Sequence, residues 1–309
     1  MTKYILSIDG GGIRGIIPAV ILAEIESKTK KPISQIFDLI AGTSTGGIIA
    51  AGLCKEDNQG NPQYSANDFV KLYEEYGPYI FKSSFLRRSI LSWFNCTKYP
   101  RKNIEFVLDK YFGDDTLKDT LSKLLITSYD IYNHCPFFFK NWKENKKFIK
   151  LKDALRATTA APTYFIPKRL KIKQMEKVLI DGGVFAKNPA ACAYASGKVL
   201  FPNDNIILLS IGTGRLSRPI EYINSKRLGM ISWIKPLISI LFTSGLDEVN
   251  YQLDKIMGNR YIRIQSQLKV ASIEMDNTTP ENMQRLKQEA KAMIKHNREA
   301  IDKFCDGFC

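Results

Sequence analysis

The stretch Phe37–Gly52, FDLIAGTSTGGIIAAG, decides the fold predicted for this chain. An apolar strand over Leu39–Ala41 leads into a turn that carries Ser44, and an apolar helix follows directly. Gly42 and Gly46 lie two residues either side of Ser44, the spacing of a nucleophile elbow, which projects a serine hydroxyl from the end of a sheet. Ser44 is therefore a candidate nucleophile. A strand–loop–helix junction packed with small residues gives the same pattern.

A second strand–turn–helix unit precedes the elbow. The predicted strand Lys3–Asp9 ends in the turn GGGIRG, which begins with Gly10, Gly11 and Gly12, and apolar residues at helical spacing follow. The N–H groups of adjacent glycines at a helix N-terminus can converge on an anion. Two such turns at one edge of a sheet suit acyl-transfer chemistry. One presents a hydroxyl nucleophile, and the other presents N–H donors to the oxyanion.

The glycine turn also has a nucleotide-binding interpretation. The spacing of Gly10–Gly15 matches the dinucleotide-binding fingerprint and would suit an oxidoreductase. That fingerprint needs an acidic residue at the end of the second strand. Here the second strand ends at Ser44, and the nearest acid, Asp38, stands near its start. No Lys-Ser/Thr pair follows the glycines, so the turn is not a Walker loop either.

The remaining segments favour an α/β fold. Apolar strands alternate with helices, which is typical of a mostly parallel sheet covered on both faces, a three-layer sandwich. We expect a catalytic domain over residues 1–215 and a mainly helical C-terminal extension over 216–309, packed on the same core. The predicted strands cover residues 123–132, 136–142, 177–180, 206–211 and, at a sheet edge, 260–268; further helices cover 68–76, 151–161, 188–199, 228–257 and 280–304.

A serine nucleophile needs a base to accept its proton. The chain has two histidines, His134 and His296, and neither follows a strand end as a triad histidine usually does. Asp181 comes at the end of a predicted strand and before two glycines, at the sheet edge where open α/β folds bind ligands. A Ser44–Asp181 dyad is the most economical assignment. Capping of the following turn is the structural alternative for Asp181.

Three motifs together carry a family resemblance. They are DGGGIRG from Asp9, GTSTG from Gly42 and DGG from Asp181. In order and separation they resemble the motifs of the patatin-like phospholipases, over about residues 3–215. The third motif reads DGG here where DGA is common in the family. No motif beyond Gly214 matches.

The resemblance implies a lipid acyl hydrolase of phospholipase A type that cleaves fatty-acyl esters of membrane glycerolipids. By position, Ser44 would be the nucleophile and Asp181 the base. The N–H groups of Gly10, Gly11 and Gly12 would form the oxyanion hole, and Arg14 would support that loop. The resemblance implies neither a metal nor an organic cofactor.

The charge balance points to an anionic partner. Lys and Arg total 45 against 31 acidic residues, a net charge of +14. Lysines cluster between residues 140 and 150 and between 168 and 177, and Phe81–Phe94 mixes aromatic with basic residues. That last segment is either a helix packed on the core or an interfacial segment. We expect peripheral contact with an anionic membrane and no nucleic-acid partner. A non-catalytic basic module that binds membrane or nucleic acid is the remaining alternative.

The N-terminus, the apolar runs and the cysteines indicate the cellular compartment in which the protein is expected. The N-terminus has no apolar signal region, and no apolar run reaches the length of a spanning helix. The six cysteines lack paired CxxC spacing, and Cys54 and Cys192 lie in apolar helical patterns, so buried free thiols in a reducing cytosol are expected. The two isolated histidines give no zinc site. The expected location is therefore cytoplasmic and peripherally membrane-associated. The sequence predicts no oligomeric state.

Overall fold

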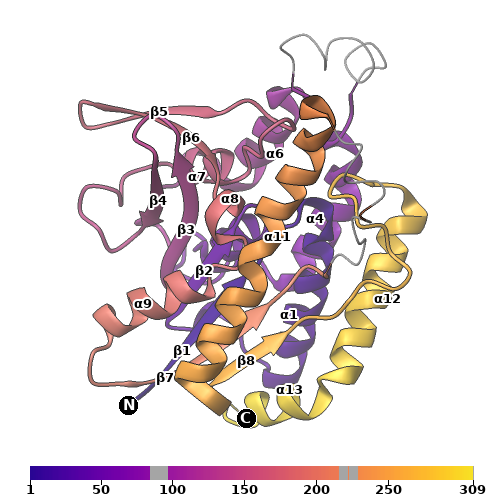
Figure 1. The fold of residues 1–309 in the computed structure, drawn as a ribbon. Coiled ribbons are helices and arrows are strands. Elements are labelled where there is room, and N and C mark those ends of the chain that lie inside the picture. Colours follow the sequence, from indigo (N-terminus) through magenta and orange to yellow (C-terminus); the bar gives the residue numbers. More distant parts are fainter. Residues whose placement is uncertain (84–96, 216–221, 223–228, 309) are drawn as a thin grey trace.

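A computed structural model describes residues 1–83, 97–215, 222 and 229–308 (Figure 1). Within these residues eight strands form one sheet. The strands are β1 Thr2–Ile8, β2 Leu39–Thr43, β3 Lys123–Asp130, β4 Cys135–Lys140, β5 Lys168–Ile172, β6 Met175–Asp181, β7 Asn205–Ile211 and β8 Tyr261–Ile264. Their order is β5-β6-β3-β2-β1-β7-β8, with β4 beside β3.

Helices cover both faces of this sheet (Figure 1). The longer ones are α1 Ile16–Thr29, α3 Thr45–Cys54, α4 Ala66–Ile80, α6 Arg101–Phe112, α7 Leu151–Thr158, α9 Ala190–Leu200, α11 Met230–Met257, α12 Pro280–His296 and α13 Arg298–Cys305. Short helical turns are η1 Gly12–Gly15, α2 Ile33–Ile36, α8 Gly183–Ala186 and η3 Gly258–Arg260. The predicted three-layer α/β architecture is confirmed.

The sheet is parallel across its centre. Strands β3, β2, β1, β7 and β8 run parallel to one another, whereas β4 and β6 pair antiparallel with β3, and β5 pairs antiparallel with β6. All five residues of β2 are buried, as expected of a strand covered on both faces. Residues of β1 divide between the two apolar cores. Ile5 packs with α9 and the end of α11, and Leu6 packs with the helices of the opposite face.

The C-terminal segment contributes to the same sheet and core. Strand β8 pairs in parallel with β7 at the edge, as its alternating sequence predicted. Helix α12 packs on α1. The single helix predicted over residues 280–304 is wrong, because the chain forms two helices that meet at Asn297. The Asn297 side chain donates a hydrogen bond to the Met293 carbonyl and so competes with the helical backbone pattern.

Strand β6 does not run in the direction that the sequence-based placement of Asp181 assumed, which was that of a strand in an open parallel sheet. Strand β6 forms a hairpin with β5 and runs antiparallel to β3. One edge of β3 is taken by β4 from Leu125 to Asp130. On the other edge, β2 pairs as far as Thr127, and β6 continues from Ser128. The ends of β2 and β6 therefore meet at consecutive residues of β3, which brings the elbow and Asp181 together from opposite directions.

Other predictions have mixed outcomes. Most of the aromatic-basic segment Phe81–Phe94 lies outside the described residues. Cys54 is a buried free thiol as predicted, and Cys192 is free but half-buried. None of the helices in the described part of the chain has both the length and the hydropathy needed to cross a bilayer.

Candidate active site

Ser44 lies in a strained backbone conformation at the tip of the turn between β2 and α3. Its φ is 55° and its ψ is −122°, which is rare for a residue with a side chain. The Ser44 N–H donates to Thr158 Oγ1 at 2.8 Å, a contact that helps hold the turn. A Cβ added at Gly42 would lie 2.2 Å from the Gly46 carbonyl, and one added at Gly46 would lie 2.2 Å from the Ile8 carbonyl. Only glycine fits either position, as an elbow requires.

Asp181 is a buried carboxyl group beside the elbow. It is 1% exposed, and its Oδ1 accepts a hydrogen bond of 2.7 Å from the Gly183 N–H. Burial raises the pKa of Asp181 to about 7, although hydrogen bonding from the Ser44 side chain, the Gly183 N–H and the nearby charge of Lys187 act to lower it. A carboxyl group with a pKa near neutrality can both accept and return a proton at physiological pH.

Five of the predicted site residues line one cavity. Ser44 and Asp181 line it together with Gly10, Gly11 and Gly12. His134 and His296 are both exposed, and neither is among the described residues that line the cavity. Most of the cavity wall is apolar and includes Ile48, Ile80, Phe81, Ile104, Phe165 and Phe242. The arrangement suits a substrate that joins a polar reacting group to an apolar chain.

The three glycine N–H groups are not equivalent. The Gly10 N–H donates to the Lys187 carbonyl at 3.0 Å, so it is already engaged within the protein. The N–H groups of Gly11 and Gly12 have no hydrogen-bond acceptor among the described residues. Of the three predicted oxyanion donors, Gly11 and Gly12 are therefore the two that are free to bind one.

Two side chains hold the peptide groups of this loop. Thr213 Oγ1 donates to the Gly10 carbonyl at 2.8 Å. Arg14 Nε and the Arg14 N–H both donate to the Gly11 carbonyl at 3.3 Å. In a trans peptide the N–H points opposite to the C=O of the same unit. Thr213 thereby orients the Gly11 N–H, and Arg14, the predicted loop support, orients the Gly12 N–H.

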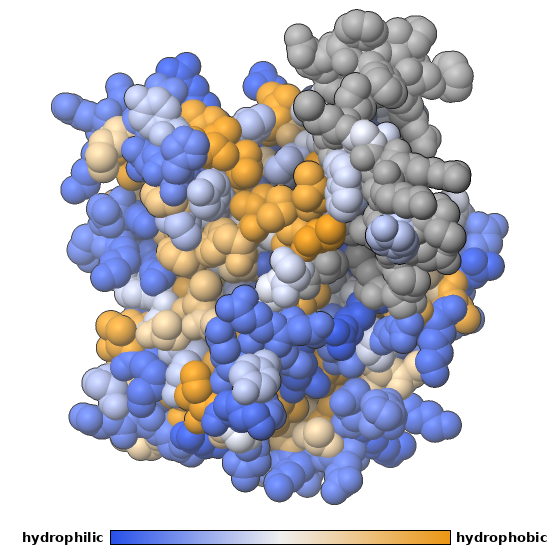
Figure 2. Space-filling view, viewed as in Figure 1, coloured by the Kyte–Doolittle hydropathy of each residue, from blue (hydrophilic) through white to orange (hydrophobic). Residues whose placement is uncertain are grey.

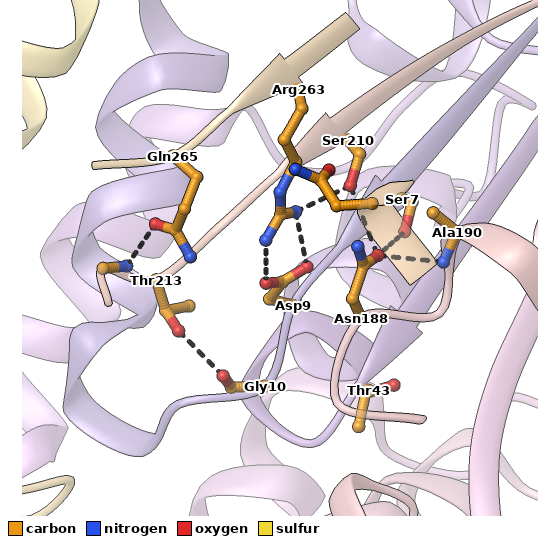
Figure 3. Close-up of polar contacts among 12 residues, drawn as sticks. Ser7, Asp9, Gly10, Thr43, Asn188, Ala190, Ser210, Thr213, Arg263 and Gln265 are labelled. Atoms are coloured by element: carbon orange, nitrogen blue, oxygen red, sulfur yellow. Dashed lines mark hydrogen bonds and ion pairs between the residues drawn. The ribbon is translucent and has the colours of Figure 1, made fainter. Parts of the chain in front are cut away.

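A buried polar network adjoins the glycine loop (Figure 3). Arg263 on β8 forms a two-pronged ion pair with Asp9, with bonds of 2.9 Å and 2.6 Å, and also donates to Ser210 Oγ at 2.7 Å. Asn188 Oδ1 accepts from the hydroxyls of Ser7 and Ser210, both at 3.3 Å. Such pairing offsets the cost of burying Asp9 at the end of β1.

Sequence reasoning missed Thr213, Lys187 and Arg263. Thr213 follows a buried strand between two glycines, and Arg263 interrupts an otherwise apolar alternating strand. Either sequence feature could have indicated a polar side chain that is buried in the protein interior. Nothing in the sequence marks Lys187, which is 6% exposed and whose pKa burial lowers to about 7.

These features define an α/β protein with an elbow serine, a buried aspartate and a glycine loop at one end of its sheet. The profile of the family described as Patatin-like phospholipase matches residues 6–194, and the chain belongs to this family. Family membership supports its assignment as a lipid acyl hydrolase.

Similar proteins span most of the chain. Patatin-like protein 2 of Arabidopsis thaliana is 32% identical, over 94% of this chain and 82% of that protein. Patatin-like protein 1 of the same plant is 30% identical, over 94% of this chain and 81% of that protein. Among solved structures, VipD from Legionella pneumophila aligns with a TM-score of 0.46 at 13% identity, over 95% of this chain and 67% of that one. This last likeness concerns the fold alone.

Proposed function

We propose that this protein is a phospholipase A-type hydrolase that cleaves fatty-acyl esters of membrane glycerolipids through Ser44 and Asp181. The observation that carries the proposal is the placement of an elbow serine against a buried carboxyl group with a pKa near 7, in a cavity with largely apolar walls. The elbow presents the hydroxyl, and the carboxylate accepts its proton.

The proposed reaction has two halves. Ser44 Oγ attacks the ester carbonyl carbon while its proton passes to Asp181. The N–H groups of Gly11 and Gly12 stabilise the oxyanion of the tetrahedral intermediate. Collapse breaks the ester bond, and the leaving alkoxide takes the proton from Asp181. Water, deprotonated by Asp181, then attacks the acyl-enzyme carbonyl carbon. Collapse of this second intermediate releases the fatty acid, and Asp181 returns the proton to Ser44 Oγ. The mechanism needs no metal and no organic cofactor.

The oxidoreductase alternative is less compatible with the loop geometry. A Cβ at Gly10 would lie 3.2 Å from the Ser44 Cβ, so the glycine loop packs directly on the elbow. The acid that would hold a ribose is absent from the end of β2. Within the proposed hydrolase, residues 1–215 carry the reacting groups. The extension over 216–309 supplies Arg263, which pairs with Asp9 at the start of the glycine loop.

Peripheral contact with an anionic membrane, without a nucleic-acid partner, forms part of the proposal. The net charge of +14 supports it, but several lysines of the two clusters are paired or shielded. Lys150 pairs with Asp114, and Lys168 pairs with Asp153. Lys146 is partly withdrawn from solvent, and burial lowers its pKa to about 8. Because these lysines are paired or shielded, they attract a membrane less than the sequence suggested.

The test is a mass-spectrometric inventory of products from a mixed lipid extract. The wild-type protein should release free fatty acids and lysolipids, whereas Ser44→Ala and Asp181→Asn should each release none above background. As the control, a variant with both His134→Gln and His296→Gln should retain most of the activity. A folded but inactive histidine variant would refute the dyad, and a fully active Ser44→Ala variant would refute the hydrolase mechanism.

A further inference from the structure

The first half of α11 is an apolar helix with an outward face. Residues 236–246, PLISILFTSGL, contain no charged side chain. Leu237, Ile240 and Leu241 are exposed by 50%, 40% and 54%, and their spacing puts them on one side of the helix. We call these three side chains the α11 patch. Figure 2 shows apolar residues gathered over the upper part of α11 and hydrophilic residues over its lower part.

The α11 patch adjoins the candidate active site. Phe242, the residue after Leu241, is 8% exposed and lines the cavity that contains Ser44 and Asp181. A Cβ added at Gly183 would lie 2.4 Å from the Phe242 ring, so this ring packs on the turn that follows Asp181. One turn of α11 therefore supplies both cavity wall and exposed apolar surface. An apolar chain that left a bilayer at the patch would have a short path to Ser44.

We propose that the α11 patch is the surface by which this protein inserts into an anionic membrane beside its active site. The inference deepens the proposed function and rests on it, because a glycerolipid substrate resides in a bilayer. Exposed leucine and isoleucine side chains on one face of a helix suit the boundary between headgroups and acyl chains.

The charges around the patch fit an anionic surface. In Figure 1 the β5–β6 hairpin lies at the same end of the molecule as the start of α11, opposite the two termini. Lys171 and Lys173 of that hairpin are exposed; Lys171 lies across from Glu176, which pairs with Arg169, and Lys173 makes no ion pair with another described residue. Further along α11, Asp247 forms an ion pair with Arg215, whereas Glu248 is exposed and would be repelled by anionic headgroups. The acidic side chain of Glu248 therefore limits insertion to the first half of the helix.

A second copy of this chain fits the patch less well than a membrane does. Three side chains that are about half exposed offer far less area than the ~800 Å² per partner of a stable protein interface. A bilayer needs no such area, because a few inserted apolar side chains and nearby cations suffice for reversible binding. Self-association is nevertheless measured in the test.

The test compares two double variants of the same helix. Leu237→Asp with Leu241→Asp alters the patch, and Tyr251→Asp with Ile256→Asp is the matched control. The control residues are exposed by 67% and 58%, lie in the second half of α11 and give the same change in net charge. Binding is measured by sedimentation with vesicles of equal parts phosphatidylcholine and phosphatidylglycerol, in a Ser44→Ala background so that the lipid is not consumed.

The patch variant should bind these vesicles about 10-fold more weakly or worse, and the control should stay within about 2-fold of the parent. Leu237→Ser with Leu241→Ser, which adds no charge, should also bind less well. With Ser44 intact, all variants should hydrolyse a short soluble ester as the parent does. Equal loss in patch and control variants would overturn the inference. So would a dimer, detected by light scattering, that the patch variant dissociates.

The outcome is separable from that of the proposed function. Vesicle binding is measured on a catalytically inactive background. The inference about the patch is therefore tested only by the difference in vesicle binding between the two double variants. Absence of ester hydrolysis in the protein with Ser44 intact would refute the proposed hydrolase function. The difference in vesicle binding between the patch and control variants would still be a valid result.

Discussion

The hydroxyl of Thr213 should control how well the glycine loop stabilises an oxyanion. Thr213 is fully buried, and its Oγ1 donates to the Gly10 carbonyl at 2.8 Å. Thr213→Val keeps nearly the same shape and removes this bond alone. The side chain also packs closely on the loop, since a Cβ at Gly11 would lie 2.4 Å from Thr213 Oγ1. The Val variant should therefore keep the packing and lose the restraint on the Gly11 N–H.

Two magnitudes follow from the loss of this bond. Leaving the Gly10 carbonyl without its partner should cost about 1–3 kcal/mol of the free energy of unfolding. Removing one oxyanion donor outright typically lowers kcat by ~10²–10³. Because Thr213→Val loosens the Gly11 donor without deleting it, we expect kcat to fall by about 10–100-fold. KM should change little, since the apolar cavity walls are untouched.

Steady-state hydrolysis of a soluble ester, together with thermal unfolding, provides the assay. Thr213→Ser retains the hydroxyl and is the control, and it should recover most of kcat. The pH profile of Thr213→Val should match that of the wild type, because Asp181 is not altered. A Val variant whose kcat stays within about 3-fold of wild type would refute this role for Thr213. If Thr213→Val and Thr213→Ser lose the same amount of kcat, the effect comes from altered packing and not from the lost hydrogen bond.

Further expectations concern the dyad and the membrane surface. Since Asp181 must be ionised to act as a base and its pKa is about 7, kcat/KM should rise with pH up to and through 7 and then level off. The same raised pKa means that the folded state holds this proton more tightly than the unfolded state does, so stability is lost as the pH rises from about 3.8 to 7. Asp181→Asn should therefore raise Tm at pH 8 relative to wild type while abolishing activity, and a lower Tm would contradict the assigned protonation. A fluorophosphonate probe should label Ser44 alone, and peptide mapping of the adduct to any other serine would refute the assignment of Ser44 as the nucleophile. Binding to anionic vesicles should weaken as the Debye length falls from about 10 Å at 0.1 M salt to about 3 Å at 1 M, whereas hydrolysis of a soluble ester should be nearly independent of salt.

The sequence alone determined the local parts of the site. The elbow around Ser44 and the glycine turn at Gly10–Gly12 are each encoded by a few consecutive residues, because only glycine tolerates the close backbone approaches at Gly12, Gly42 and Gly46. Alternating apolar strands and helices likewise predicted the α/β class. The three motifs in order were enough to indicate the family.

Tertiary structure decided what depends on contacts between distant segments. Asp181 reaches Ser44 because an antiparallel β6 takes over the edge of β3 where β2 stops, and strand direction is not encoded in the motif itself. The occupied N–H of Gly10 became visible only with the fold in hand. The same holds for the position of Phe242 in the cavity wall.

The partner of Asp9 illustrates the physical reason. A buried carboxylate must be paired, so the sequence could predict that Asp9 requires a donor or a cation. It could not predict which of 45 Lys and Arg residues supplies it. Arg263 lies 254 positions further along the chain, and it reaches Asp9 only because β8 joins the sheet on the far side of β7. Local sequence fixes backbone shape at a turn, whereas pairing across the sheet depends on how the whole chain packs.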